Sequence, residues 1–355
     1  MKRTQMNNEL PIPAFFDLKK ANSVWSVDYR ARRQDALAWA KKYGLNPASQ
    51  DLVKICLMEI DNQNTFGLPQ FELFVGGRSG DGAIKDAIRL AEFKYRNLAK
   101  ISKIAVTMDS HLPFMIFDPL LFINDAGDHP ADNSPMSSKD LLNGTWKVDP
   151  AAAAALGQDY VALQKHAIYY TEDLERRGKY SLFLWTPHGQ IMGIGHALMS
   201  IIEEAVYFHS VARHIQPTVE VKGLNPLTEN YSILRPEVLT TYDNQPIAQK
   251  NVKFLQALLK YDYVIIAGQA KSHCVAWTID DLLTEIQSQD AELAKKVYLL
   301  EDCTSPVFIP KSVTGLPNDI DFTDQADAAF VRFAKAGMHL VKSTDPIESW
   351  PGIKL

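Results

Sequence analysis

The chain has 355 residues, 46% of them hydrophobic, which is enough for one large α/β domain or two small ones with a substantial core. Its net charge is −5 at pH 7 and its charged residues are scattered, so it lacks the basic stripe that nucleic-acid binding needs and we expect no nucleic-acid partner. No apolar run reaches the roughly 20 residues that cross a bilayer, and the start MKRTQMNNEL leads into no apolar signal segment, so we expect a cytoplasmic protein with no membrane partner.

The first 50 residues contain one predicted helix, from about Val27 to Tyr43. Gly44 follows in the position of a helix C-cap, and Pro47 prevents the helix from resuming. We therefore expect residues 1–50 to form a helical extension that packs on the outside of the next domain or on a neighbouring subunit.

Residues 51–345 indicate one domain, because apolar runs alternate with helical patterns. Most of the runs lack period-two alternation, which is typical of strands buried on both faces. This order predicts a three-layer α/β/α fold with a mainly parallel sheet of about six strands, in which functional groups gather at the carboxyl ends of the strands. The apolar runs are 54–61, 104–109, 181–185, 218–223, 263–268, 297–302 and 338–343, and the helical patterns are 82–98, 196–213, 247–260, 273–287 and 323–336.

Residues 130–180 interrupt this alternation. They begin with the polar, turn-rich segment HPADNSPMSSKD, and a helix is predicted to start at Asp149 and Pro150, an N-cap followed by a proline in the first helical position. We expect an insertion within the domain here, and a C-terminal tail at 346–355.

The cysteines, Cys56, Cys274 and Cys303, are too few and too scattered for a disulfide framework. Cys274 follows a predicted strand and turn and lies at the start of the next helix, with Ser272 as the predicted N-cap. Unpaired N–H groups and the helix dipole at this place favour a thiolate, and the same N–H groups could hold an oxyanion. The alternative is that Cys274 only fills space at the helix start.

Two charged residues lie at the ends of other predicted strands. Asp61 ends one apolar run and Lys222 ends another, so both could converge with Cys274 in the crevice where parallel strands end. Together they would be a proton-transferring carboxylate, a stabilising cation and a nucleophile. Taken singly, each is more often an ordinary strand-end charge that meets solvent.

Asp109 and His111 alternate just past a third strand, a spacing that can turn both side chains toward one ion. His129 and His188 are two further histidines in loops. Carboxylate and imidazole ligands suit Zn, Fe, Mn or Co, and a site with three protein ligands leaves positions open for water or substrate. A surface or core pair is the alternative for Asp109 and His111.

These segments occur in an order that resembles a known family. The segment 61-DNQNTF-66 fits Asp-x-Gln-x-x-Phe, 107-TMDSH-111 fits Thr-x-Asp-x-His, and 185-WTPH-188 loosely fits Trp-Pro-x-His. The segment 222-KGLNPLTENYS-232 carries Lys-Gly followed by Tyr-Ser, and 268-GQAKSHCV-275 fits Gly-x-Ala-x-x-x-Cys-Val. On these motifs, residues 51–345 apart from the insertion resemble the isochorismatase-like cysteine hydrolase superfamily, and within it the nicotinamidases.

The resemblance implies roles for individual residues. Cys274 would be the nucleophile, Asp61 the general base and later acid, and Lys222 the cation that tunes both. The N–H groups of Ala270 and Cys274 would form the oxyanion hole, and the peptide between Gln269 and Ala270 would be cis.

The resemblance also implies a cofactor and a pocket. Asp109, His111 and His188 would hold a divalent metal (Zn, Fe or Mn) that binds the substrate's pyridine nitrogen, with no organic cofactor. His129 is an alternative to His188 because it lies closer in sequence to Asp109 and His111. The implied substrate pocket comprises Gln63, Phe66, Trp185, Tyr231 and His273.

Three functions follow from this pattern. The first is hydrolysis of a small carboxamide through a cysteine thioester, with nicotinamide giving nicotinate and ammonia. The second keeps the catalytic residues but acts on another small amide, a ureide or an isochorismate-type substrate. The third is a catalytically silent binding protein that uses the extension and the insertion. The resemblance further suggests a homo-oligomer.

Overall fold

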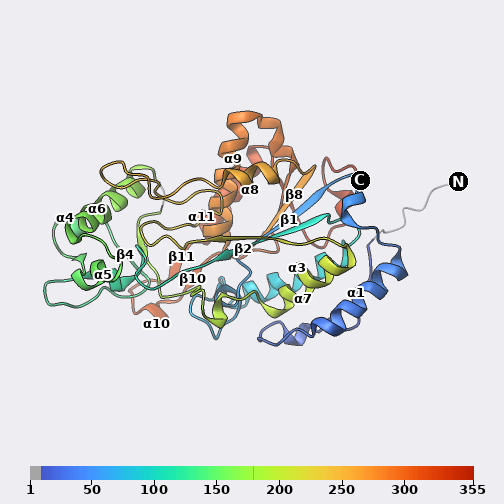
Figure 1. Ribbon diagram of the computed structural model, residues 1–355, viewed down its shortest axis with the longest axis horizontal. Helices are drawn as coiled ribbons and strands as arrows, with labels where there is room; N and C mark the ends of the chain where they lie inside the picture. Colours follow the sequence, from blue (N-terminus) through green and yellow to red (C-terminus); the bar gives the residue numbers. More distant parts are fainter. Residues whose placement is uncertain (1–8, 179) are drawn as a thin grey trace.

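The computed structural model describes residues 9–178 and 180–355. Its centre is one six-stranded sheet in the order β12-β9-β8-β1-β2-β7, and every neighbouring pair is parallel (Figure 1). The predicted α/β fold with a parallel sheet is therefore confirmed. The strands are β1 (Ile55–Ile60), β2 (Lys103–Asp109), β7 (Thr218–Lys222), β8 (Tyr263–Gly268), β9 (Val297–Leu300) and β12 (His339–Val341).

Helices cover both faces of the sheet (Figure 1). Alternate residues of β1 enter different cores: Leu57 packs with the helices of one face, whereas Met58 packs with those of the other. Among the described residues, no helix is both long enough and apolar enough to span a membrane. One face carries α1 (Tyr29–Tyr43), α3 (Gly82–Arg96) and α7 (Ser200–Ala212), and the other carries α8 (Val252–Leu258), α9 (Ala276–Gln289) and α11 (Thr323–Lys335).

The helix predicted near the N-terminus is α1, and it packs along α7. The ring centroids of Trp39 and Phe208 lie 6.2 Å apart across this contact. Asp28 caps the helix start by accepting a hydrogen bond from the N–H of Ala31, and Gly44 ends it with a left-handed φ of 62°. The extension is therefore an outer layer on this face of the sheet.

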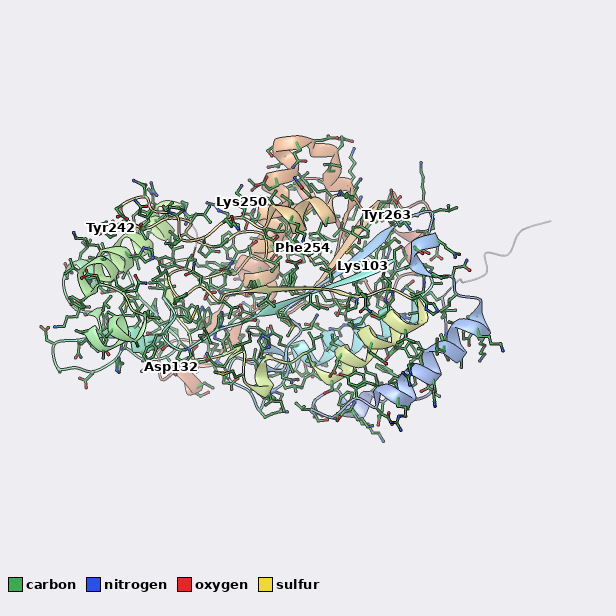
Figure 2. All side chains as sticks on the ribbon, in the orientation of Figure 1. Lys103, Asp132, Tyr242, Lys250, Phe254 and Tyr263 are labelled. Carbon is green, nitrogen blue, oxygen red and sulfur yellow. The ribbon has the colours of Figure 1, made fainter. Side chains whose placement is uncertain are left out.

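The insertion lies beyond the carboxyl ends of the strands. In Figure 2, Lys103 and Tyr263, the first residues of β2 and β8, lie on the right, whereas Asp132 and Tyr242 lie at the opposite end with the insertion helices. The strands therefore point toward the insertion. Its helices are α4 (Ser138–Leu142), α5 (Pro150–Ala155) and α6 (Tyr160–Arg176), and Asp149 caps α5 as predicted.

The apolar run at 181–185 contains a short strand, but this strand does not belong to the main sheet as the alternation of runs and helices had suggested. It contains β6 (Phe183–Leu184), which pairs antiparallel with β4 (Ser134–Pro135). Its apolar side chains pack in a separate core with the insertion, and an apolar run alone does not reveal its partner. The remaining short elements are α2 (Asn64–Gly67), β3 (Phe122–Ile123), β5 (Lys147–Val148), β10 (Phe308–Ile309), α10 (Lys311–Thr314) and β11 (Ile320–Asp321).

Candidate active site

Three predicted residues meet at the carboxyl end of the sheet. Asp61 follows β1, Lys222 ends β7, and Cys274 lies six residues after the end of β8. The Nζ of Lys222 lies 3.0 Å from Oδ2 of Asp61 and 3.5 Å from Sγ of Cys274. All three residues are buried, at 0%, 4% and 7% exposure respectively. The sequence therefore predicted their convergence, and burial makes their charges interact strongly.

Thr107 of β2 fixes the Asp61 carboxylate. Its hydroxyl donates a 2.5 Å hydrogen bond to Oδ1 of Asp61 and accepts one of 3.1 Å from the Asp61 N–H. Burial raises the pKa of Asp61; Lys222 opposes this and Asp109 adds to it. The role of Thr107 was not predicted from the sequence, although Thr107 alternates with Asp109 and His111 on the same face of one extended segment.

Cys274 lies in a single π-helical turn, Lys271–Val275, that leads into α9. β8 ends at Gly268, where a Cβ would lie 2.0 Å from the carbonyl oxygen of Ile60, so only glycine fits. The peptide between Gln269 and Ala270 is cis, as the resemblance implied. Ser272 does not cap the helix, contrary to prediction: its hydroxyl oxygen accepts a 3.0 Å hydrogen bond from the N–H of Val307.

The predicted thiolate at the helix start is not supported by the electrostatics of the site. Burial raises the pKa of the Cys274 thiol well above its ordinary value, and this outweighs the lowering by Lys222; Asp61 and Asp109 raise it further. Burial lowers the pKa of Lys222, but Asp109, Asp61 and Cys274 together hold it well above its ordinary value. The site thus contains a buried thiol that holds its proton and, beside it, an ammonium that stays charged.

Asp109, His111 and His188 form a group suited to a metal ion. One ligand atom from each lies within 4.8 Å of the others, and all three residues are buried. The Nδ1 of His111 pairs with the carbonyl of His188 at 3.1 Å, and the Nδ1 of His188 pairs with the carbonyl of Thr186 at 2.8 Å. Because a carbonyl oxygen can only accept, each Nδ1 carries the proton in these bonds and Nε2 remains the ligand atom.

The Nε2 atom of His111 shows whether these three side chains suit a metal ion. It is buried and makes no aligned hydrogen bond within the described residues, although Oδ1 of Asp109 lies 3.2 Å away. Burial lowers the pKa of His111, but Asp109 and Glu229 outweigh it and raise the pKa to about 10. A divalent cation would take the place of the proton that this raised pKa keeps on Nε2 of His111, so the three side chains fit a metal.

His129 does not join this group. Its Nδ1 pairs with the carbonyl oxygen of Phe122 at 2.7 Å, within the insertion region, and the three-residue group includes His188 instead. The sequence analysis missed Glu229, whose Oε1 lies 3.7 Å from Nε2 of His111. No pattern in the sequence marked this residue, because it lies in an irregular loop between β7 and α8.

A cavity of about 30 Å³ opens between the metal group and Cys274. Of the predicted pocket residues, Gln63 lies elsewhere: its side-chain amide donates to the carbonyl of Asp109 at 2.9 Å and accepts from the N–H of Asp109 at 2.7 Å. Gln63 therefore fixes the end of β2, which carries Asp109, and does not line the cavity. The predicted residues that do line the cavity are Phe66, Trp185, Tyr231 and His273, with Ala270 and Cys274 beside them.

A larger groove, of about 650 Å³, runs along α1 and α7. Its lining residues include Leu37, Val206 and Pro217 and none of the predicted site residues. Size alone therefore does not identify the site, and the buried charges at the strand ends do.

No protein-family model matches the chain, and no curated protein matches it. Solved structures that resemble it include a yeast nicotinamidase bound to the inhibitor nicotinaldehyde, which is 18% identical with a TM-score of 0.48 and covers 81% of this chain and 99% of its own. An Acinetobacter baumanii nicotinamidase and pyrazinamidase is 17% identical, with a TM-score of 0.46, and covers 83% and 99%. A Pyrococcus horikoshii pyrazinamidase in complex with zinc is 16% identical, with a TM-score of 0.42, and covers 81% and 99%. The sequence motifs resemble those of the same enzymes. The chemistry proposed for this chain rests on its own side chains.

Replacing His188 by alanine should reduce the affinity of the protein for a divalent metal by at least about 100-fold, because one of three protein ligands is lost. The matched control is His129→Ala, which removes a histidine outside the metal group and should keep the metal. Metal content after dialysis against a limiting chelator measures both variants. Loss of metal from His129→Ala with retention in His188→Ala would reverse the ligand assignment.

Proposed function

We propose that the chain hydrolyses a small aromatic carboxamide through a thioester on Cys274, with nicotinamide as the substrate. The observation that carries the proposal is the position of Lys222 Nζ, which lies 3.0 Å from the Asp61 carboxylate and 3.5 Å from the Cys274 sulfur. A buried nucleophile, acid–base group and cation have no structural need to share one strand end. Their contacts also favour an enzyme over a silent binding protein.

In the acylation step, Asp61 takes the thiol proton as Cys274 attacks the carboxamide carbon. Burial raises the pKa of Asp61, which suits it to hold that proton. The carbonyl oxygen becomes an oxyanion, for which the N–H groups of Ala270 and Cys274 are the proposed donors. Asp61 then gives the proton to the departing nitrogen, ammonia leaves, and a thioester remains on the sulfur.

In the deacylation step, water attacks the thioester while Asp61 takes one of its protons. The second tetrahedral intermediate collapses, the carbon–sulfur bond breaks, and the sulfur recovers a proton from Asp61. The products are the free thiol and nicotinic acid, which releases a proton to solvent and leaves as nicotinate. Lys222 stays charged throughout and offsets the negative charge that passes between the sulfur and the carboxylate.

Asp109, His111 and His188 would hold the metal in this proposal, with Zn, Fe or Mn as candidates. When bound, the ion would supply a Lewis acid that binds the pyridine nitrogen of the substrate. Glu229 and Asp109 both approach His111 and make this corner of the pocket negative, which favours a cation.

The pocket shape supports an aromatic substrate but also a second candidate. Phe66, Trp185 and His273 supply flat surfaces around the cavity, and the indole N–H of Trp185 donates a 2.9 Å hydrogen bond to the hydroxyl of Tyr231. The cavity is small, about 30 Å³, so it favours compact substrates. A smaller aliphatic amide or a ureide is the second candidate, because it needs less space than a pyridine ring.

Ammonia release from purified, metal-loaded protein tests the proposal. We expect nicotinamide to have a higher kcat/KM than acetamide or N-carbamoylglycine, and removal of the metal to reduce the nicotinamide rate most, because the metal binds only the pyridine. A preference for the aliphatic amides that is insensitive to chelation would establish the second candidate instead. Absence of ammonia from every substrate would overturn the proposed chemistry.

A further inference from the structure

The side chain of Gln269 points away from the cavity into a buried hydrogen-bonded network. It is 0% exposed; its Nε2 donates to Oδ2 of Asp86 at 2.9 Å, and its Oε1 accepts from the N–H of Ser305 at 3.4 Å. A carboxylate can only accept and a backbone N–H can only donate, so these two partners define the orientation of the amide. Gln269 is the residue between β8 and Ala270, and its side chain therefore ties this turn to α3.

Asp86 is an unusual residue to find at this position of α3. It is 2% exposed, and its second oxygen accepts a 2.7 Å hydrogen bond from Arg89, one turn along the helix. A buried carboxylate costs free energy unless its oxygens accept hydrogen bonds. An ion pair of Asp86 with Arg89 would form equally well at the surface, so that pair does not explain why Asp86 is buried. Gly82 allows the close approach of α3, because a Cβ there would lie 2.4 Å from Oγ of Ser305.

The backbone of the same turn is also held on both sides. The N–H of Gln269 donates to the carbonyl of Ile60 at 2.7 Å, immediately before Asp61, and the N–H of Lys271 donates to the carbonyl of Ser305 at 2.8 Å. Within residues 9–178 and 180–355, the N–H of Ala270 donates to no acceptor. This leaves one N–H free in a turn whose neighbours are fixed, which is the arrangement that an oxyanion needs.

We propose that Asp86 is a positioning residue, which through the side chain of Gln269 aims the N–H of Ala270 at the oxyanion of the reaction. The inference rests on the proposed hydrolysis by Cys274. Asp86 contacts neither substrate nor sulfur, so it acts through the side chains that it holds, Gln269 and Ser305. Donors that stabilise an oxyanion must be oriented before the charge develops, and a displacement of about 1 Å costs about 100-fold in rate.

The test compares Asp86→Ala, Gln269→Met and the double variant with the wild type, using nicotinamide. Each single variant should lower kcat by about 10- to 100-fold and change KM by less than about threefold, because the ground state makes little use of the oxyanion donors. The double variant should be no slower than the slower single variant, since both changes break the same link. If Asp86→Ala fails to fold, Gln269→Met removes the same hydrogen bond from the other side and carries the test.

Inhibitor binding separates positioning from a structural role. Nicotinaldehyde adds to the thiol: its carbonyl carbon bonds to the sulfur, the thiol proton passes to Asp61, and the oxygen takes the oxyanion position. Its affinity should fall by the same factor as kcat in both single variants. Binding of nicotinate, which forms no such adduct, should change by less than about threefold.

The matched control is Asp173→Ala, which breaks a similar pair of a buried aspartate with an arginine three residues later, Arg176, in the insertion. It should leave kcat and both affinities within about twofold of the wild type. Equal losses for nicotinaldehyde and nicotinate in Asp86→Ala, or losses that multiply in the double variant, would overturn the inference. A wild type that neither releases ammonia nor binds nicotinaldehyde would instead refute the proposed function on which the inference rests.

Discussion

Replacing Cys274 by alanine should lower the rate of amide hydrolysis by about 10⁴-fold or more, because no other group in the pocket can form the thioester. Cys274 is 7% exposed, so its truncation leaves a void, but the change removes one heavy atom and should cost only about 1 kcal/mol in the free energy of unfolding. Ammonia release from nicotinamide measures the rate, and urea denaturation measures the stability. Metal content should be unchanged, because Cys274 is outside the metal group.

The matched control is Cys56→Ala, which removes another buried thiol, from β1. Cys56 packs in the core beneath the sheet and does not line the cavity, so its loss should leave activity within about twofold. Intact-mass analysis of the wild type quenched during turnover should show the added acyl group, and Cys274→Ala should not. Ammonia release by Cys274→Ala at a rate near that of the wild type would mean that the reaction proceeds without a thioester.

The sequence predicted most of the sheet because buried parallel strands leave a clear pattern. All six residues of β1 are buried, and all but Glu59 are apolar. The same pattern located the site, since Asp61 and Lys222 are charged residues at the ends of such runs. The carboxyl ends of parallel strands lie at the same edge of a sheet, so the positions of Asp61 and Lys222 in the sequence predict that both face one crevice.

The direction of individual polar side chains could not be predicted in the same way. Gln63 lies within a motif and turns to the backbone of Asp109, whereas Ser272 pairs with Val307 and not with its own helix. Both bonds join segments that are far apart in sequence. A hydroxyl or amide takes the partner that the packed structure supplies, and the local pattern does not contain that information.

Burial also changes the protonation state that the sequence suggests. A cysteine at a helix start beside a lysine predicts a lowered pKa, yet burial raises the pKa of Cys274 despite Lys222. Desolvation depends on how completely the neighbouring segments close over the sulfur, including Trp185 after the insertion. In the proposed mechanism, the proton transfer to Asp61 is therefore part of the reaction and is not completed beforehand.

Replacing Lys222 by methionine should both destabilise the fold and abolish most of the activity. Lys222 lies 3.0 Å from Asp61 and 2.7 Å from Asp109, and its side chain is 2% exposed. Its loss leaves two buried carboxylates without that cation, so we expect the free energy of unfolding at pH 7 to fall by about 3–5 kcal/mol. The rate should fall by at least about 100-fold, because the thiolate and Asp61 lose their stabilising charge.

The pH dependence of Lys222→Met distinguishes lost charge from lost packing. Lys222 lowers the pKa of Asp61, which burial already raises, so the carboxyl in the variant takes up a proton at a higher pH than in the wild type. A folded-state pKa above the unfolded value of about 3.9 adds stability at low pH that is lost as the pH rises. The stability gap between Lys222→Met and the wild type should therefore narrow as the pH falls from 7 toward about 4, with both proteins kept in EDTA.

Lys94→Met is the matched control, because Lys94 also forms a fully buried ion pair, 2.9 Å from Glu59. It should lose stability by a similar amount, since it also leaves a buried carboxylate unpaired, but retain the turnover of each folded molecule. If the difference in stability between Lys222→Met and the wild type does not change with pH, packing of the lysine side chain accounts for most of the loss of stability. In that case Asp61 would already be neutral in the wild type, and it could not accept the thiol proton as the proposed mechanism requires.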